Sequence, residues 1–228
     1  MARFDRMTVY STMMSDGVLP LFNSPDVALV KGVVAALVRG GSRVMEYTNR
    51  GDFAFNVFSE LIQHTTKTQP DIILGVGSIE DAPTAAAYIA QGANFIVAPN
   101  FNPEVARLCN RRKIAYIPGC GSVTEISNAE EWGVEIVKLF PADSLGGADF
   151  VKAILGPRPW TRILPTGGVS PDEANLRAWF GAGAACVGMG SKLIRSDWLK
   201  DGNFAAMETL VRDTLALINT IRSEKPAK

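Results

Sequence analysis

The sequence predicts an α/β protein with the TIM (β/α)8 barrel fold and an extra N-terminal helix, in one domain spanning residues 1–228. Short apolar runs alternate along the chain with amphipathic segments, and there are eight such pairs. Strands that alternate with helices form a parallel sheet whose faces are covered. Eight pairs in a chain of this length favour a closed barrel over an open sheet. In such barrels the active site lies at the C-terminal ends of the strands.

The predicted strands are short runs rich in Val, Ile, Leu and Phe, and their starts lie 20 to 29 residues apart. That spacing accommodates one strand, one helix and two short loops. The eight runs are residues 17–22, 43–48, 72–77, 95–99, 115–119, 136–140, 162–167 and 185–190.

The segments between the strands have helical patterns. Residues 27–38 are amphipathic, and residues 82–91 are rich in alanine, the best helix former. Ser170 is followed by a proline and two acids, which predicts a helix with Ser170 as its N-cap and Pro171 at its first position. We expect residues 3–15 to form an extra helix over the barrel bottom, and residues 203–223 to form the last helix.

Composition excludes several classes of protein. Lys and Arg together number 23, as do Asp and Glu, so no basic field is available for nucleic acid or an anionic membrane surface. No run reaches the roughly 18 apolar residues that span a bilayer, and the N-terminus lacks the apolar core of a secretory signal. The isolated cysteines and single histidine form no metal-ligand pattern. We therefore expect a cytoplasmic protein without a metal or other cofactor.

Lys138 is the most informative residue, because it lies within an apolar predicted strand between Val137 and Leu139. An ammonium there would be costly unless it is paired or neutralised. Burial disfavours the charged form of a lysine, and the neutral amine is the nucleophile that forms an imine with a ketone. The alternative is a lysine at the barrel end that points outward or forms a salt bridge.

Glu46 is a second charge inside an apolar strand, and Arg50 follows in the loop where that strand should end. A desolvated carboxylate has a raised pKa, which suits it to proton exchange near neutral pH. The planar guanidinium of Arg50 can bind a substrate carboxylate through two hydrogen bonds. The alternative is that Glu46 forms a structural ion pair with Arg50 or Lys138.

Two glycine-containing segments lie in the loops after the seventh and eighth strands, where many such barrels bind phosphate. Glycines allow backbone N–H groups to approach an anion, and a helix N-terminus favours its negative charge. The residues that we expect to bind substrate in these loops are Thr166, Gly167, Gly168, Gly190 and Ser191.

Together these motifs resemble the 2-keto-3-deoxy-6-phosphogluconate (KDPG) and 4-hydroxy-2-oxoglutarate (KHG) aldolases, over about residues 17–193. Residues 137–142 look like the Schiff-base lysine motif of the family, and residues 46–50 resemble its Glu-x-Thr-x-Arg segment. In that segment the Glu is the acid/base and the Arg holds the keto-acid carboxylate. The resemblance also implies that Ser78 helps to hold the pyruvate moiety and that Pro99 contacts substrate.

The resemblance implies a class I aldolase, a cytoplasmic homotrimer that cleaves KDPG to pyruvate and glyceraldehyde 3-phosphate through a Schiff base. Alternatives within the family are cleavage of 4-hydroxy-2-oxoglutarate or of the galactonate-derived epimer. Outside it they are a phosphosugar epimerase or isomerase, and a non-catalytic barrel that binds a phosphorylated metabolite. The departures from the family pattern include Asn100, Phe101, Cys120, Met189 and Lys192. They leave the imine chemistry intact and concern the middle and distal parts of the substrate.

Overall fold

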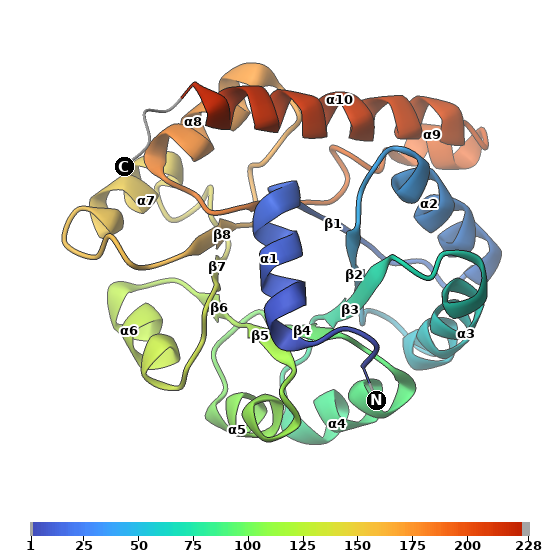
Figure 1. Ribbon diagram of the computed structural model, residues 1–228, viewed down its shortest axis with the longest axis horizontal. Coiled ribbons are helices and arrows are strands. Elements are labelled where there is room, and N and C mark those ends of the chain that lie inside the picture. Colours follow the sequence, from blue (N-terminus) through green and yellow to red (C-terminus); the bar gives the residue numbers. More distant parts are fainter. Residues whose placement is uncertain (1, 225–228) are drawn as a thin grey trace.

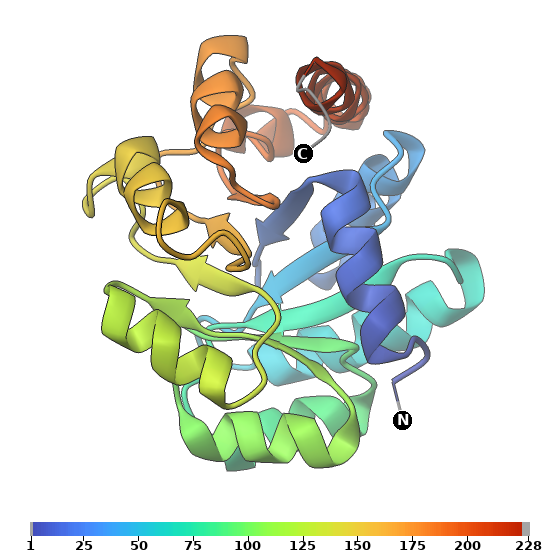
Figure 2. The same ribbon diagram turned by 60° about the vertical axis from the view of Figure 1, so that its left-hand side comes forward.

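The computed structural model describes residues 2–224, and its parallel strands form a (β/α)8 barrel surrounded by helices (Figures 1 and 2). The prediction of the fold class is confirmed, whereas residues 1 and 225–228 of the predicted domain lie outside the described part. The strands are β1 (Val18–Phe22), β2 (Val44–Thr48), β3 (Ile73–Gly77), β4 (Phe95–Val97), β5 (Ala115–Ile117), β6 (Gly119–Cys120), β7 (Val137–Leu139), β8 (Ile163–Pro165) and β9 (Val187–Met189).

The barrel consists of two groups of paired strands, ordered β5-β4-β3-β2-β1-β9 and β6-β7-β8. The first junction lies at Pro118, between β5 and β6, which were predicted as one strand. Proline has no N–H to donate to a ladder, but the carbonyl of Pro118 accepts from the N–H of Lys138 at 2.8 Å. One stretch of chain therefore changes partner from β4 to β7. At the second junction, Thr166 after β8 pairs with Gly188 in β9 through a single parallel bridge, which closes the barrel.

The helices surround the barrel in chain order (Figure 1). They are α2 (Val27–Arg39), α3 (Ala54–Thr68), α4 (Ala82–Gln91), α5 (Pro103–Arg112), α6 (Val123–Glu131), α7 (Gly147–Leu155), α8 (Glu173–Ala182), the short α9 (Ser196–Lys200) and α10 (Phe204–Ser223). Among the described residues, no helix is both long enough and apolar enough to cross a membrane.

The predicted start of α8 is wrong by two residues, because Asp172 and not Ser170 occupies the N-cap position. The groups of Ser170 are already used in the preceding loop. Its N–H donates to Oδ1 of Asn175 at 2.9 Å, and its hydroxyl donates to the carboxylate of Asp172 at 2.6 Å. Pro171 consequently lies before the helix and not at its first position.

Helix α1 (Arg6–Asp16) covers the N-terminal end of the barrel, as predicted for the extra helix (Figure 1). Asp5 caps it by accepting from the N–H groups of Met7 and Thr8. Val9 and Met13 are fully buried in the cluster that fills the barrel interior, and burial of a side chain of this size contributes about 1.5–3 kcal/mol.

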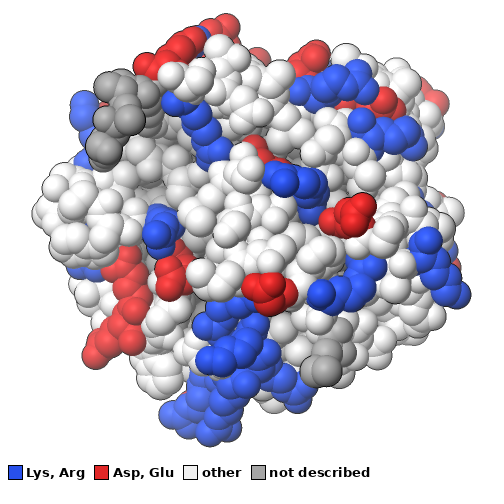
Figure 3. Space-filling model, viewed as in Figure 1, with Lys and Arg blue, Asp and Glu red and all other residues white. Residues whose placement is uncertain are grey.

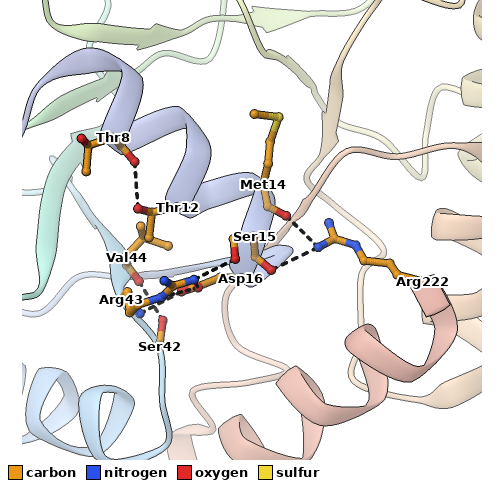
Figure 4. Close-up of polar contacts among 9 residues, drawn as sticks. All are labelled: Thr8, Thr12, Met14, Ser15, Asp16, Ser42, Arg43, Val44 and Arg222. Carbon is orange, nitrogen blue, oxygen red and sulfur yellow. Dashed lines mark hydrogen bonds and ion pairs between the residues drawn. The ribbon is translucent and has the colours of Figure 1, made fainter.

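Polar contacts also attach α1 to the rest of the molecule (Figure 4). The carboxylate of Asp16 accepts from both the N–H and the guanidinium of Arg43, which precedes β2. Arg222 of α10 donates to the carbonyls of Met14 and Ser15, at 2.6 and 3.2 Å. This end of the barrel is therefore covered by α1.

Figure 3 views the covered N-terminal end, where Lys and Arg side chains gather over α5. Arg111 and Arg112 end that helix and Lys113 is its C-cap. Cations at this position interact favourably with the carbonyl end of the helix dipole.

Two apolar clusters form the core. The larger lies between the sheet and the surrounding helices, and the smaller fills the barrel interior beneath α1. Phe95 belongs to the interior cluster, and a Cβ at Gly75 would overlap its ring. Gly75 therefore leaves room for the Phe95 ring inside the barrel.

Candidate active site

Lys138 lies in the middle of β7 with only 7% of its surface exposed. Its Nζ is 4.8 Å from the centroid of the ring of Phe140, a 39% exposed residue that directly follows the same strand. Among the described residues, no carboxylate lies within ion-pair distance of this amine. The geometry thus disfavours the alternative of an outward or salt-bridged lysine.

Glu46 lies in β2 with 2% of its surface exposed, and its side chain extends over β3. A Cβ at Gly77 would overlap the carboxylate, so a glycine is needed there for Glu46 to occupy this position. Burial raises the pKa of Glu46, while the charge of Lys138, a hydrogen bond with Thr48 and the charge of Arg50 oppose the rise.

Neither Lys138 nor Arg50 forms a salt bridge with Glu46 in the described part of the chain. The alternative of a structural ion pair is therefore disfavoured. Lys138 nevertheless contributes the largest opposing effect on the pKa of Glu46, so the two groups act on one another inside the barrel.

A cavity of about 690 Å³ opens at the C-terminal ends of the strands. Thr48 and Phe140 are part of its wall, and each lies two residues beyond a buried charged group on its strand. Because residues i and i+2 of a strand share a face, Glu46 and Lys138 lie one layer deeper than the cavity wall. Six of the predicted site residues line the cavity: Arg50, Thr166, Gly167, Gly168, Gly190 and Ser191.

Ser78 and Pro99 are not part of this wall. Both lie at the same end of the barrel, Ser78 immediately after β3 and Pro99 two residues after β4. Ser78 has a left-handed backbone, with φ of 59°, and is half-buried. The carbonyl of Pro99 lies against Gly119, where a Cβ would overlap it. The structure thus places these two residues at the correct end but outside the cavity lining.

The loop after β8 depends on its glycines. Gly167 and Gly168 have φ of 105° and 69°, and a Cβ at Gly168 would be 2.6 Å from Cβ of Asp143. Among the described residues, the backbone N–H groups of Gly167, Gly168, Gly190 and Ser191 have no protein acceptor. Free N–H groups from two neighbouring loops are typical of an anion-binding site.

Thr166 adds an unpartnered hydroxyl to this wall. Its Oγ1 is buried and has no hydrogen-bond partner in the described part of the molecule. A Cβ at Gly188 would overlap this oxygen, so the glycine leaves room for the hydroxyl between β8 and β9. An unsatisfied buried hydroxyl costs free energy, and a ligand that bonds to it would remove that cost.

Several cavity residues were missed by the sequence analysis, including Asn23, Asp172, Ser196 and Leu199. The position of Asn23 directly after the first strand was a usable signal, since the site lies at the strand ends. Ser196 and Leu199 belong to α9, which is too short to give a helical periodicity. No group of three or more His, Cys, Asp or Glu side chains suited to a metal occurs among the described residues.

The fold and the site together define a barrel protein with a cavity at the C-terminal ends of its strands, lined in part by glycine loops, and with the buried charged residues Lys138 and Glu46 in its interior. The family model described as KDPG and KHG aldolase matches residues 9–210. This chain belongs to the KDPG and KHG aldolase family, and it is therefore an aldehyde-lyase of the class I type.

Individual relatives agree with the family match. A 2-dehydro-3-deoxy-phosphogluconate aldolase of Treponema pallidum is 31% identical over 94% of this chain and the whole of that protein. A KHG/KDPG aldolase of Escherichia coli is 33% identical over 79% of this chain and 82% of its own. The crystal structure of KDPG aldolase from Legionella pneumophila, with pyruvate captured as a covalent carbinolamine, aligns with a TM-score of 0.81. It shares 27% identity and covers 90% of this chain and 97% of that one.

Proposed function

We propose that this protein cleaves 2-keto-3-deoxy-6-phosphogluconate to pyruvate and glyceraldehyde 3-phosphate through a Schiff base on Lys138. The observation that carries the proposal is the buried amine of Lys138, which has no carboxylate within ion-pair distance in the described chain and lies beneath a cavity lined by the glycine loops. The covalent carbinolamine in the Legionella pneumophila relative supports the same chemistry.

The reaction begins when Nζ of Lys138 attacks the C2 ketone of the substrate. Loss of water gives a protonated imine, which withdraws electrons from the C3–C4 bond. Removal of the proton from the C4 hydroxyl then breaks that bond, and glyceraldehyde 3-phosphate leaves. The remaining enamine is protonated at C3, and hydrolysis of the imine releases pyruvate and restores the lysine.

Glu46 is the proposed acid/base, acting directly or through a water molecule. Its buried position raises its pKa, and a group that titrates closer to neutral pH exchanges protons more effectively there. The charge of Lys138 acts on the pKa of Glu46, which supports a role for both groups on one bound substrate. The same carboxylate can therefore accept the C4 hydroxyl proton and return a proton to the enamine.

The two ends of the substrate are held on different parts of the cavity. Arg50 binds the keto-acid carboxylate. The proposed contacts of Ser78 and Pro99 with the pyruvate part rest on the family resemblance, since both lie outside the cavity wall. The free N–H groups of Gly167, Gly168, Gly190 and Ser191, together with the hydroxyl of Thr166, bind the phosphate. Fixing both ends places the ketone against one amine, which raises the effective molarity of the reaction.

The Schiff base is tested by treating the protein with pyruvate and sodium borohydride. We expect one covalent adduct per chain, located on Lys138 by peptide mass spectrometry, because borohydride reduces the imine to a stable secondary amine. A phosphosugar epimerase or isomerase requires no imine, so wild-type protein that gains no adduct would contradict the proposal.

Arg50→Lys tests the carboxylate site. Lysine retains the charge but loses the planar fork that binds a carboxylate through two hydrogen bonds. We expect the pyruvate concentration for half-maximal adduct formation to rise about 10-fold, the effect of losing roughly 1.4 kcal/mol of binding free energy. Arg107→Lys, on the outer face of α5, is the matched control. Unchanged saturation by pyruvate in Arg50→Lys would show that Arg50 does not hold the carboxylate.

Three finer alternatives share this site. The protein could cleave 4-hydroxy-2-oxoglutarate or the galactonate-derived epimer, or it could bind a phosphorylated metabolite without turnover. The name of the Escherichia coli relative, KHG/KDPG aldolase, includes the unphosphorylated acid 4-hydroxy-2-oxoglutarate and so supports the first alternative. A pyruvate-release assay with the three acids separates them, and we expect the phosphorylated gluconate-derived acid to react fastest. A homotrimer, which the resemblance implies, remains our expectation for the assembly.

A further inference from the structure

We propose that Lys192 selects substrates that carry a phosphate at the end remote from the keto acid. The inference rests on the proposed function and assigns a specificity-determining role to one residue of the same cavity. Lys192 is exposed, lines the cavity and follows Ser191 in the loop after β9.

The backbone fixes where Lys192 lies. The carbonyl of Gly190 accepts hydrogen bonds from the N–H groups of Leu193 and Ile194, both at 2.9 Å, which closes a tight turn. The side chains of Leu193 and Ile194 are buried in the core. The turn is therefore held on its inner side, and Lys192 is kept on the outer side, at the cavity wall.

The charged residues that line the cavity indicate why Lys192 matters for phosphate binding. Of the residues that line it, Arg50 and Lys192 are positive and Asp172 is negative. Arg50 follows β2 and is assigned to the keto-acid carboxylate, whereas Asp172 belongs to the same loop as Gly167 and Gly168. Without Lys192, a phosphate bound by the glycine loops would face the carboxylate of Asp172 with only neutral donors to hold it.

Lys192 is also free to serve a ligand. Among the described residues it forms no ion pair, whereas the carboxylate of Asp172 already accepts the hydroxyl hydrogen of Ser170 at 2.6 Å. An ammonium is a compact point charge with three rotatable donors, which suits a phosphate that is already positioned by backbone N–H groups. A substrate with a terminal hydroxyl would gain little from the same ammonium.

The test compares kcat/KM for 2-keto-3-deoxy-6-phosphogluconate and for the unphosphorylated 2-keto-3-deoxygluconate. In Lys192→Gln we expect the ratio of the two values to fall about 10-fold to 100-fold, mainly through KM for the phosphorylated acid. Lys192→Arg should preserve most of the ratio, because it keeps the charge. Lys200→Gln, at the end of α9 and outside the cavity wall, is the matched control and should keep the wild-type ratio.

An unchanged ratio in Lys192→Gln, or an equal loss for both substrates, would overturn the assignment. Borohydride trapping with pyruvate distinguishes this failure from failure of the proposed function. If wild-type protein and Lys192→Gln both form the adduct while the ratio stays constant, only the role of Lys192 is wrong. If wild-type protein forms no adduct, the proposed Schiff-base chemistry is wrong, and the proposed role of Lys192, which depends on it, is wrong as well.

Discussion

Replacement of Lys138 by alanine is expected to lower turnover by about 10⁴-fold or more, since the proposed mechanism has no route without the imine. The substitution removes a buried amine that has no ion-pair partner among the described residues, so we expect the barrel to remain folded. Turnover is measured by coupling pyruvate release to a dehydrogenase. Far-ultraviolet circular dichroism and thermal unfolding report whether the fold is retained.

Lys152→Ala provides the matched control, because Lys152 is an exposed lysine of α7 outside the cavity. It should retain wild-type turnover. Activity of folded Lys138→Ala within a few-fold of wild type would exclude Lys138 as the nucleophile. An equal loss in both lysine variants would indicate a general effect of removing a positive charge.

Glu46→Gln has the second largest expected effect, a loss of turnover of about 10²-fold to 10⁴-fold, the usual contribution of a positioned acid or base. Glutamine has nearly the same shape but cannot exchange the proton. Glu125→Gln, on the surface of α6, is the control for loss of a carboxylate. If Glu46→Gln turned over KDPG at the wild-type rate, another group would have to move the proton.

The same variant carries a prediction about stability and pH. Burial raises the pKa of Glu46 above its value in the unfolded chain, so the folded state binds this proton more tightly. Stability from this group is fully present below pH about 4 and is lost as the pH rises through the raised pKa. Glu46→Gln lacks that loss, so its melting temperature should exceed that of wild type at pH 8 and approach it at pH 4. A variant that melts lower than wild type at pH 8 would contradict this sign.

The barrel could be predicted from sequence because periodicity and spacing are local properties of the chain. Each predicted strand coincides with an observed one to within a few residues, with the split at Pro118 as the exception. That split depends on which neighbour each half of the strand pairs with, and pairing is a tertiary property. The start of α8 was misplaced for a similar reason, because Asn175 engages the N–H of Ser170 from within the helix.

The site could be predicted in part. A charge inside an apolar strand is a signal that a sequence displays directly, and it drew attention to Lys138 and Glu46, which are both buried in the structure. The sequence contains no comparable signal for Gly77, whose role depends on the side chain of another strand. Nor could spacing alone show that Ser78 and Pro99 lie outside the cavity wall while Asp172 and Lys192 belong to it.

The single bridge between Thr166 and Gly188 has a further consequence. The two loops assigned to phosphate leave the barrel on opposite sides of this junction, one after β8 and one after β9. A phosphate bound by both loops would connect the ends of β8 and β9 across this junction. Phosphate affinity and the separation of β8 from β9 are then thermodynamically linked. A change that favours separation of the two strands must therefore also weaken substrate binding.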